Sequence, residues 1–469
     1  MIISKGGCRV RVVFIALLMT TVMILMLSSI HTGRQRTKIL IAREQQTEEV
    51  DILDNLWSPP VVEEPKYFTY EKPKHKQPRT NVNHGVGEIG SDPINPMWAY
   101  FDPRYLRITV VTISNWNAGK TIYCRYYDHN GTQIGKVDTT RNRIDFLLDC
   151  RQGVYAPYVA ISDNGWFTEG KPRLLPVTVL PKAPPTEPTF NVCMAPLWGD
   201  GLHYLLLLQF IEYYRMVGAQ HLFVYVLEVK DTATKSVLDF YDMKKVITVI
   251  PIKRNDTDSN HCTQHVICRH KAAWQDCILR SVHRFKYTAV IDMDELIVPL
   301  QHSSLPELLS TLDVKWVGDS LFSSFMFRPR WVTRVEETPS ADHLVKVPDA
   351  QLPDFVWQYL PVFRYHNTSQ AAPPIFINKC IVKPERIAYM GVHVVHYAVY
   401  ETRKDDYIYE TYEVDPTIAY IRHFNRNAGF MAIFGKPEIT EMPTVFGSQL
   451  HRRAFTAMKL IRANLPKQT

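Results

Sequence analysis

The pattern of apolar and polar positions divides the 469-residue chain into four regions. The first holds an uncharged run of 19 residues, Val12 to Ile30, which is just long enough to cross a hydrocarbon core as a helix. A cleaved signal peptide is the alternative, but its apolar part is usually shorter and ends in small residues. Basic residues follow this run instead. The sequence therefore favours an uncleaved transmembrane helix at 12–30, behind a short cytosolic tail at 1–11.

The next two regions differ in their periodicity. Residues 31–95 keep no period and are interrupted by prolines, which predicts an extended stem. Residues 96–183 contain short β-branched segments and a turn signal at Asp128–Gly131, which predict a small β-rich domain. A proline-rich stretch at 181–188 predicts a linker. The strands expected in this domain are 106–113, 121–127, 143–149, 155–162 and 174–180.

Strand-like and helix-like segments alternate in the last region, 189–460. This alternation predicts an α/β domain with a mainly parallel sheet and helices on both faces. Ligands of such sheets bind beyond the carboxyl ends of the strands. The expected strands are 190–195, 221–228, 246–252 and 287–291, and the expected helices are 202–217, 232–243 and 266–285.

The charge of the chain is concentrated near the first apolar run. Residues 1–43 hold seven basic residues and no acidic one, whereas the rest of the chain holds 47 of each, so the net charge of +7 arises at the N-terminus. A folded part without a basic excess argues against a nucleic-acid partner. Both flanks of the run are basic, so charge alone does not orient it in a membrane.

Cysteines and glycosylation signals favour a luminal location for the folded part. Of the eight cysteines, Cys8 precedes the apolar run, and Cys124 with Cys150 is predicted to staple the β-rich domain. Cys262 and Cys268 lie among histidines, which leaves a local disulfide or a zinc site open, although the spacing fits no standard zinc pattern. Three tripeptides fit the N-glycosylation pattern, and they begin at Asn130, Asn255 and Asn367.

The strongest chemical signal is an acidic triplet after a predicted buried strand. Asp292 and Asp294 follow the apolar segment 287–291 and are two residues apart, so their side chains would point to the same side of an extended backbone. Paired carboxylates suit Mg²⁺ or Mn²⁺ that also binds phosphate oxygens. A solvated acidic turn is the alternative. The triplet ends with Glu295 and leads into the apolar segment 296–298.

Residues 191–426 resemble glycosyltransferase family 92, a family of the GT-A type. The resemblance covers about half of the chain and rests on motifs that occur in order. They are Asn191–Cys193, Gln209–Gly218, His221–Val226, Gln275–Cys277, Ile291–Pro299, Lys379–Arg386, Gly391–His393 and Arg422–His423–Phe424.

The resemblance implies a GT-A-like fold, a nucleotide-sugar donor, manganese dependence and inverting transfer. Activities of this family add galactose from UDP-galactose, notably to fucose on the core of N-glycans. By the same resemblance, Asp292 would meet the donor ribose or the metal, Asp294 would bind the metal, and Glu295 would support the turn. Asp276 and Glu212 are counted with the donor-binding residues.

Other site residues are assigned less directly. A late histidine often completes the metal shell in GT-A enzymes, and His393 is the first choice because it matches the Gly-Val-His of the family; His396 and His423 are the alternatives. Inverting transfer also needs a general base to deprotonate the acceptor hydroxyl. The sequence does not identify this base, and its weak candidates are Asp354, Glu336 and Glu337.

Taken as a sequence, the chain is therefore predicted to be a Golgi membrane protein with a type II anchor and a luminal glycosyltransferase body. It would use a UDP-sugar, Mn²⁺ or Mg²⁺, and a glycan acceptor. The main alternative is a catalytically silent, membrane-anchored protein of the same fold that binds glycans. A secreted metal-dependent hydrolase is a weaker alternative, because the chain lacks a histidine-rich binuclear motif.

Overall fold

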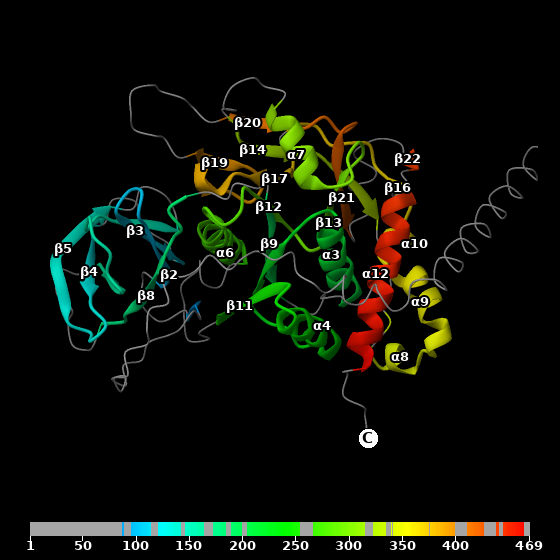
Figure 1. Cartoon of the computed structure of the whole chain (residues 1–469), viewed down its shortest axis with the longest axis horizontal. Helices are drawn as coiled ribbons and strands as arrows, with labels where there is room; N and C mark the ends of the chain where they lie inside the picture. Colours follow the sequence, from blue (N-terminus) through cyan, green and yellow to red (C-terminus); the bar gives the residue numbers. More distant parts are fainter. Residues whose placement is uncertain are drawn as a thin grey trace, which may run out of the picture. The chain divides into compact units, whose positions relative to one another are not determined.

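Figure 1 shows the computed structural model of the chain, in which Thr69–Thr469 form one compact unit. In the part of the chain that the structure describes, no helix is both long and apolar enough to cross a membrane. The predicted anchor at 12–30 lies outside that part. The described residues are 87–88, 95–113, 121–141, 146–163, 172–183, 189–198, 204–253, 266–314, 322–333, 339, 341–374, 376–398, 410–425, 438–439 and 444–463.

The predicted β-rich region forms a seven-stranded sheet. Its strands are β2 (Pro96–Asp102), β3 (Arg107–Thr112), β4 (Thr121–Tyr127), β5 (Gln133–Arg141), β6 (Leu147–Cys150), β7 (Tyr158–Ser162) and β8 (Leu175–Val179). Their order across the sheet is β5-β4-β7-β8-β2-β3-β6. The sequence had indicated five of these strands, and β2 and β5 were missed.

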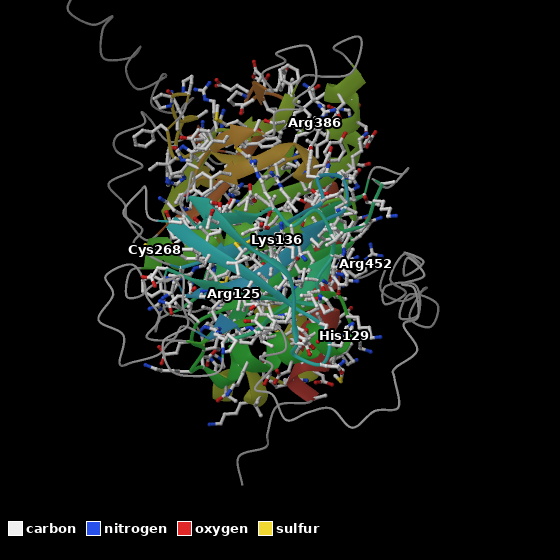
Figure 2. All side chains as sticks on the ribbon, turned by 90° about the vertical axis from the view of Figure 1, so that its left-hand side faces the viewer. Arg125, His129, Lys136, Cys268, Arg386 and Arg452 are labelled. Atoms are coloured by element: carbon white, nitrogen blue, oxygen red, sulfur yellow. A yellow bond between two sulfur atoms is a disulfide. The ribbon has the colours of Figure 1, made fainter. Side chains whose placement is uncertain are left out.

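The turn between β4 and β5 illustrates how the local sequence shapes this sheet. The carboxylate of Asp128 accepts hydrogen bonds from the backbone amides of Asn130 and Thr132, each at 2.8 Å. Gly131 has a φ of +79°, which a glycine adopts without strain. His129 lies at the tip of this turn, on the side of the molecule that faces the viewer in Figure 2. The predicted hairpin turn is confirmed.

The α/β region is built on an eight-stranded mixed sheet. Its strands are β1 (Gly87–Glu88), β9 (Phe190–Leu197), β10 (His221–Val226), β11 (Ile247–Lys253), β12 (Tyr287–Ile291), β14 (Phe322–Phe327), β17 (Lys379–Val382) and β20 (Glu410–Glu413). Their order is β1-β11-β10-β9-β12-β17-β14-β20, with antiparallel pairs only on either side of β17. The predicted mainly parallel sheet is confirmed. The short strand β1 comes from the segment that was expected to be an irregular stem.

Helices cover both faces of this sheet, with α6 (Val266–Ser281) and α3 (Tyr204–Met216) on opposite sides of β9 and β12 in Figure 1. Helix α4 (Thr232–Met243) has the predicted bounds, and the carboxylate of Asp231 caps its first turn. Helix α6 was expected to reach Phe285, but it ends at Ser281. His283 has a φ of +59°, and such a left-handed residue ends a helix.

The remaining elements follow β12 along the chain. A three-stranded sheet contains β13 (Glu295–Pro299), β21 (Ala419–Asn425) and β15 (Pro329–Thr333), in that order. Two small antiparallel pairs are β16 (Asn367–Thr368) with β22 (Glu438–Ile439), and β18 (Ile387–Met390) with β19 (Val395–Ala398). The other helices are α7 (Leu305–Val314), α8 (Ala341–Lys346), α9 (Leu352–Tyr359), α10 (Pro361–Arg364) and α12 (Thr444–Ala463).

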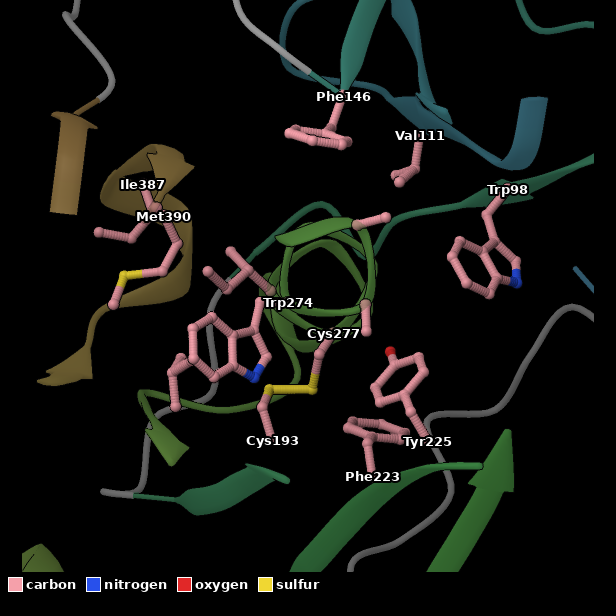
Figure 3. Close-up of a cluster of buried hydrophobic side chains, with 14 of the residues drawn as sticks. Trp98, Val111, Phe146, Cys193, Phe223, Tyr225, Trp274, Cys277, Ile387 and Met390 are labelled. Atoms are coloured by element: carbon pink, nitrogen blue, oxygen red, sulfur yellow. A yellow bond between two sulfur atoms is a disulfide. The ribbon is translucent and has the colours of Figure 1, made fainter. Parts of the chain in front are cut away.

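The two large sheets share one hydrophobic core around α6. Trp98 and Phe146 of the β-rich region belong to the same buried cluster as Trp274 of α6 (Figure 3). The disulfide between Cys193 and Cys277 ties β9 to α6 within this cluster. The β-rich region is therefore packed against the helix that covers the central strands of the α/β sheet.

The cysteines confirm one predicted pair and assign another. Cys124 and Cys150 form the predicted disulfide of the β-rich region. Cys268, near the start of α6 (Figure 2), is also in a disulfide, so it is not a free thiolate for zinc. Cys262, the partner that the sequence favoured, lies outside the described residues. Cys380 is a buried free cysteine.

Candidate active site

The acidic triplet forms a tight turn between β12 and β13. The amide of Glu295 donates to the carbonyl of Asp292 at 3.1 Å, and the carboxylate of Glu295 accepts from the amide of Asp292 at the same distance. The side chain of Glu295 is fully buried, while those of Asp292 and Asp294 are 29% and 32% exposed. The turn therefore presents two carboxylates at the carboxyl end of a parallel strand, with the third beneath them.

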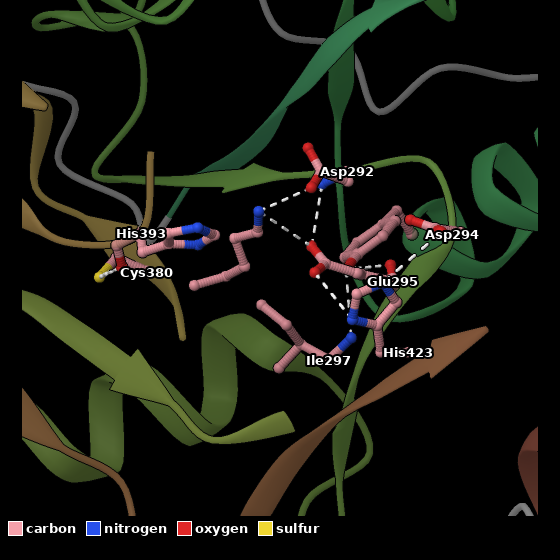
Figure 4. A network of polar contacts seen from close by, with 9 residues as sticks. Asp292, Asp294, Glu295, Ile297, Cys380, His393 and His423 are labelled. Atoms are coloured by element: carbon pink, nitrogen blue, oxygen red, sulfur yellow. Dashed lines mark hydrogen bonds and ion pairs between the residues drawn. The ribbon is translucent and has the colours of Figure 1, made fainter. Parts of the chain in front are cut away.

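A buried lysine faces this turn from the neighbouring strand β17. The ammonium of Lys379 lies 2.7 Å from Oδ2 of Asp292 and 3.6 Å from Oε2 of Glu295 (Figure 4). It also lies 5.4 Å from the ring centroid of Trp274. Antiparallel pairing of β17 with β12, with Cys380 opposite Val290, brings the lysine to this position. Lys379 begins one of the family motifs, but its local sequence indicates no role for the lysine.

His423 faces the turn from the other side. It lies on β21 directly opposite Glu295, with Nδ1 3.4 Å from that carboxylate and Nε2 3.5 Å from Asp294. Burial lowers the pKa of His423, but the two carboxylates outweigh this effect and raise the pKa to about 9. In this arrangement His423 carries a proton at neutral pH, and its role as the alternative metal ligand stays a prediction.

The carboxylates of the turn differ in their charge. Burial raises the pKa of Asp292, but Lys379 and His270 outweigh it and bring the pKa to about 2. Burial also raises the pKa of Glu295, and here it prevails over Lys379, so the pKa is about 7. Asp292 is therefore ionised at neutral pH, whereas Glu295 gains or loses its proton there.

His393 lies between β18 and β19, and its carbonyl accepts a hydrogen bond from the thiol of Cys380, the residue after Lys379, at 3.6 Å (Figure 4). Burial, together with Lys379, lowers the pKa of His393 to about 4, so the imidazole is neutral at physiological pH. Neutral imidazole is the form that binds metals. His396, by contrast, is exposed on β19, and its ring packs 5.7 Å from that of Tyr389. Of the three predicted histidines, the structure places His393 and His423 beside the turn.

The donor set of the turn suits a divalent ion that is shared with a ligand. Oδ1 of Asp292 is buried and has no hydrogen-bond partner among the described residues. Mg²⁺ and Mn²⁺ commonly take one or two carboxylates together with substrate phosphates. Within the described ranges, no three His, Cys, Asp or Glu side chains are grouped to hold a metal by themselves. The predicted set of Asp292, Asp294 and His393 is therefore not assembled as a three-ligand cluster, and their metal role stays a prediction.

Asp276 does not line an open pocket. It lies on α6, is fully buried, and accepts hydrogen bonds from the hydroxyls of Tyr100 and Tyr225 and from Arg280. The bonds from Tyr225 and Arg280 are both 2.6 Å long. Because both carboxylate oxygens are occupied, Asp276 is placed as a structural link between the β-rich sheet, β10 and α6. The predicted contact of Asp276 with the sugar donor stays a prediction.

Glu212, like Asp276, is a buried carboxylate whose oxygens accept hydrogen bonds from neighbouring side chains. It is buried on α3 and accepts hydrogen bonds from Tyr241 at 2.5 Å, Arg453 at 2.9 Å and Arg215 at 3.2 Å. These partners come from α4, α12 and α3, so the carboxylate joins three helices. A buried carboxylate with both oxygens paired holds the three helices together, and neither oxygen is left to bind the nucleotide-sugar.

The candidates for the general base remain unassigned. Asp354 is exposed on α9, beside His451 rather than beside the acidic turn. Glu336 and Glu337 lie outside the described residues.

One exposed aromatic residue lies at the same edge of the sheet as the turn. Trp198 directly follows β9 and is 51% exposed. Parallel pairing of Met194 with Ile291 places Trp198 beyond Asp292 in the strand direction. Its local sequence does not mark Trp198 as a site residue, because its position depends on which strand neighbours β12.

The family model of glycosyltransferase family 92 matches residues 189–458. The chain therefore belongs to glycosyltransferase family 92. The matched segment begins just before β9 and ends within α12, so it contains the acidic turn, Lys379 and His423. No curated protein matches the chain.

Partial similarity to solved structures is also found. Glucosyl-3-phosphoglycerate synthase from Mycobacterium tuberculosis, in complex with Mn²⁺, UDP-glucose and phosphoglyceric acid, is 11% identical; the match covers 60% of this chain and 81% of that one, with a TM-score of 0.25. A mannosyltransferase from Pyrobaculum calidifontis, in complex with GDP-Man and Mn²⁺, is 12% identical over 60% and 75% of the chains, with a TM-score of 0.27. TM-scores this low carry no argument about this chain.

Proposed function

We propose that the protein is a metal-dependent hexosyltransferase that transfers galactose, with inversion, from a UDP-sugar to a glycan hydroxyl. Fucose on the core of an N-glycan is the acceptor that the family resemblance favours. The observation that carries the proposal is the turn at the end of β12, where Asp292 and Asp294 are partly exposed in a family 92 domain.

The residues of the turn have distinct tasks in this proposal. Asp292 and Asp294 would hold Mn²⁺ or Mg²⁺, which when bound offsets the charge of the departing diphosphate. Oδ1 of Asp292 is the oxygen left for this contact, because Lys379 occupies Oδ2. Glu295 keeps the turn closed through its hydrogen bond to the amide of Asp292. His393, as a neutral imidazole, is the nearby candidate for a third ligand.

A luminal location is part of the proposal. The disulfides Cys124–Cys150 and Cys193–Cys277 are typical of an oxidising compartment. Asn130 and Asn367, which begin two of the glycosylation tripeptides, are exposed. With the apolar run at 12–30, these features support a Golgi protein with a type II anchor. N-terminal sequencing of protein from cells tests the anchor. A mature protein that begins after Ser29 would contradict it.

The function is tested by incubating purified protein with Mn²⁺ and a panel of nucleotide sugars, with and without fucosylated N-glycans. Release of UDP that requires both UDP-galactose and acceptor is the expected result. The variant Asp294→Asn serves as the matched control. Glycan binding without nucleotide release by the wild type would instead support the silent glycan-binding protein.

A further inference from the structure

The acidic turn already contains a resident cation. The side chain of Lys379 is only 1% exposed, and its ammonium contacts both Asp292 and Glu295. Its strand, β17, is paired on both sides, by β12 and β14. Trp274 packs against the ammonium and is itself stacked on His270, with ring centroids 5.4 Å apart and planes 22° apart. The lysine is therefore fixed in place and has no short path to solvent.

Lys379 offsets part of the negative charge of the turn. Asp292 and Asp294 contribute two carboxylates, and the ammonium of Lys379 lies against the first of them at the distance given above. The affinity of a carboxylate site for a divalent ion rises with the net negative charge of its ligands. By itself, this turn offers such an ion little net negative charge.

We propose that Lys379 is a positioning residue that makes the binding of the metal depend on the donor diphosphate. It holds Oδ2 of Asp292, leaves Oδ1 without a hydrogen-bond partner, and offsets the charge of the turn. A nucleoside diphosphate brings the missing negative charge, so metal and nucleotide bind with positive coupling. The effect is reciprocal, because each ligand strengthens the binding of the other by the same factor. This inference rests on the proposed function and concerns the same site.

The experiment measures Mn²⁺ binding to the full chain by electron paramagnetic resonance, first without nucleotide and then with saturating UDP. Lys379→Met alone would leave Glu295 buried beside a missing cation, which would destabilise the fold. The informative pair is therefore Glu295→Gln and the double variant Glu295→Gln/Lys379→Met. Glutamine can still accept the hydrogen bond from the amide of Asp292, so the two proteins differ in the lysine charge alone. Thermal unfolding verifies that both are folded.

Relative to Glu295→Gln, the double variant should bind Mn²⁺ at least about tenfold more tightly without nucleotide, because a like charge near the ion is removed. The gain in Mn²⁺ affinity on adding UDP should shrink by a similar factor. Lys379→Arg, which keeps the charge, should retain the gain. If Lys379 only supports the fold, replacing it would lower the unfolding temperature and leave the UDP-dependent gain in Mn²⁺ affinity unchanged.

Two failures can be told apart. If the double variant is folded and its nucleotide-free affinity for Mn²⁺ is equal or weaker, the role of Lys379 is overturned. Loss of the UDP-dependent gain in folded Lys379→Arg would overturn it too. If the wild type binds no Mn²⁺ even with UDP present, the proposed metal-dependent function itself fails.

Discussion

Two carboxylate networks of this protein use similar residues in different ways. Asp276 is fully buried, and two tyrosine hydroxyls and an arginine occupy its oxygens. Asp292 also has a basic partner, Lys379, but it is partly exposed and keeps one oxygen unpaired. The difference teaches that a partly exposed carboxylate with an unpaired oxygen is available for chemistry, whereas a buried carboxylate with both oxygens paired holds structural elements together.

The largest effect on stability is expected at the saturated network. Asp276→Asn removes the buried charge that balances Arg280, and we expect it to lower the free energy of unfolding by roughly 3 to 5 kcal/mol. Tyr225→Phe is the matched control and should cost only about 1 kcal/mol, because it removes one hydrogen bond. Urea unfolding measures both. If Asp276→Asn weakened binding of the nucleotide-sugar without a loss of stability, Asp276 would belong to the donor site. The difference in role between Asp276 and Asp292 would then be wrong.

The opposite pattern is expected at the turn. Asp294→Asn should reduce turnover at least about a hundredfold, or about 3 kcal/mol in the barrier, because a neutral amide offsets the charge of a divalent ion poorly. Its unfolding temperature without metal should barely change, since the side chain is 32% exposed. Asp239→Asn, at an exposed position on α4, controls for the loss of one surface charge. Near-normal turnover of Asp294→Asn with saturating Mn²⁺ would refute the metal role.

The stability contributed by the turn should also depend on pH. The pKa of His423 is raised from 6.5 to about 9, so its stabilising contribution is complete below pH 6.5 and is lost as pH rises through about 9. The pKa of Glu295 is raised to about 7, so measurements above pH 7 isolate the histidine. We expect the wild type to lose roughly 2 kcal/mol between pH 7 and 9 and His423→Gln to lose less. Parallel unfolding curves for the two proteins over this range would contradict the assignment.

A smaller effect is expected at the apolar end of the same edge. If Trp198 stacks on the base of the donor, Trp198→Ala should weaken UDP binding by roughly 1 kcal/mol, or about fivefold. Binding of Mn²⁺-pyrophosphate, which has no base, should stay unchanged. Trp357→Ala, at an exposed tryptophan on α9, is the matched control. Calorimetry measures the UDP affinity of both variants. Equal affinities would contradict stacking of the base on Trp198.

Local patterns were sufficient for much of the framework. An apolar, β-branched run predicted β12 with its observed bounds, and the turn signal Asp128–Gly131 predicted the hairpin after β4. Buried positions and turns such as these depend on neighbours in sequence, so period and turn chemistry reveal them. The end of α6 was misplaced because the left-handed backbone at His283 follows from packing rather than from helix propensity.

Roles that depend on distant partners could not be predicted in this way. The sequence marked Asp292, Asp294, Asp276 and Glu212 alike as acidic residues in motifs of one family. Only the packing of α6 and α3 revealed that the last two are saturated by their neighbours. Lys379 was overlooked because it lies 87 residues from Asp292 in the chain.

By itself, the sequence determined the alternation of strands and helices from β9 to β12, the acidic turn at the end of β12, the disulfide Cys124–Cys150 and membership of the family. Each of these features depends on a short segment, on residue type or on an ordered series of motifs, so it can be recognised without the fold. The tertiary structure decided which carboxylates keep an unpaired oxygen, which cations face them, and that Cys193 pairs with Cys277. The reason is physical: burial and opposite charge set the state of an ionisable group, and both arise from residues that only the fold brings together.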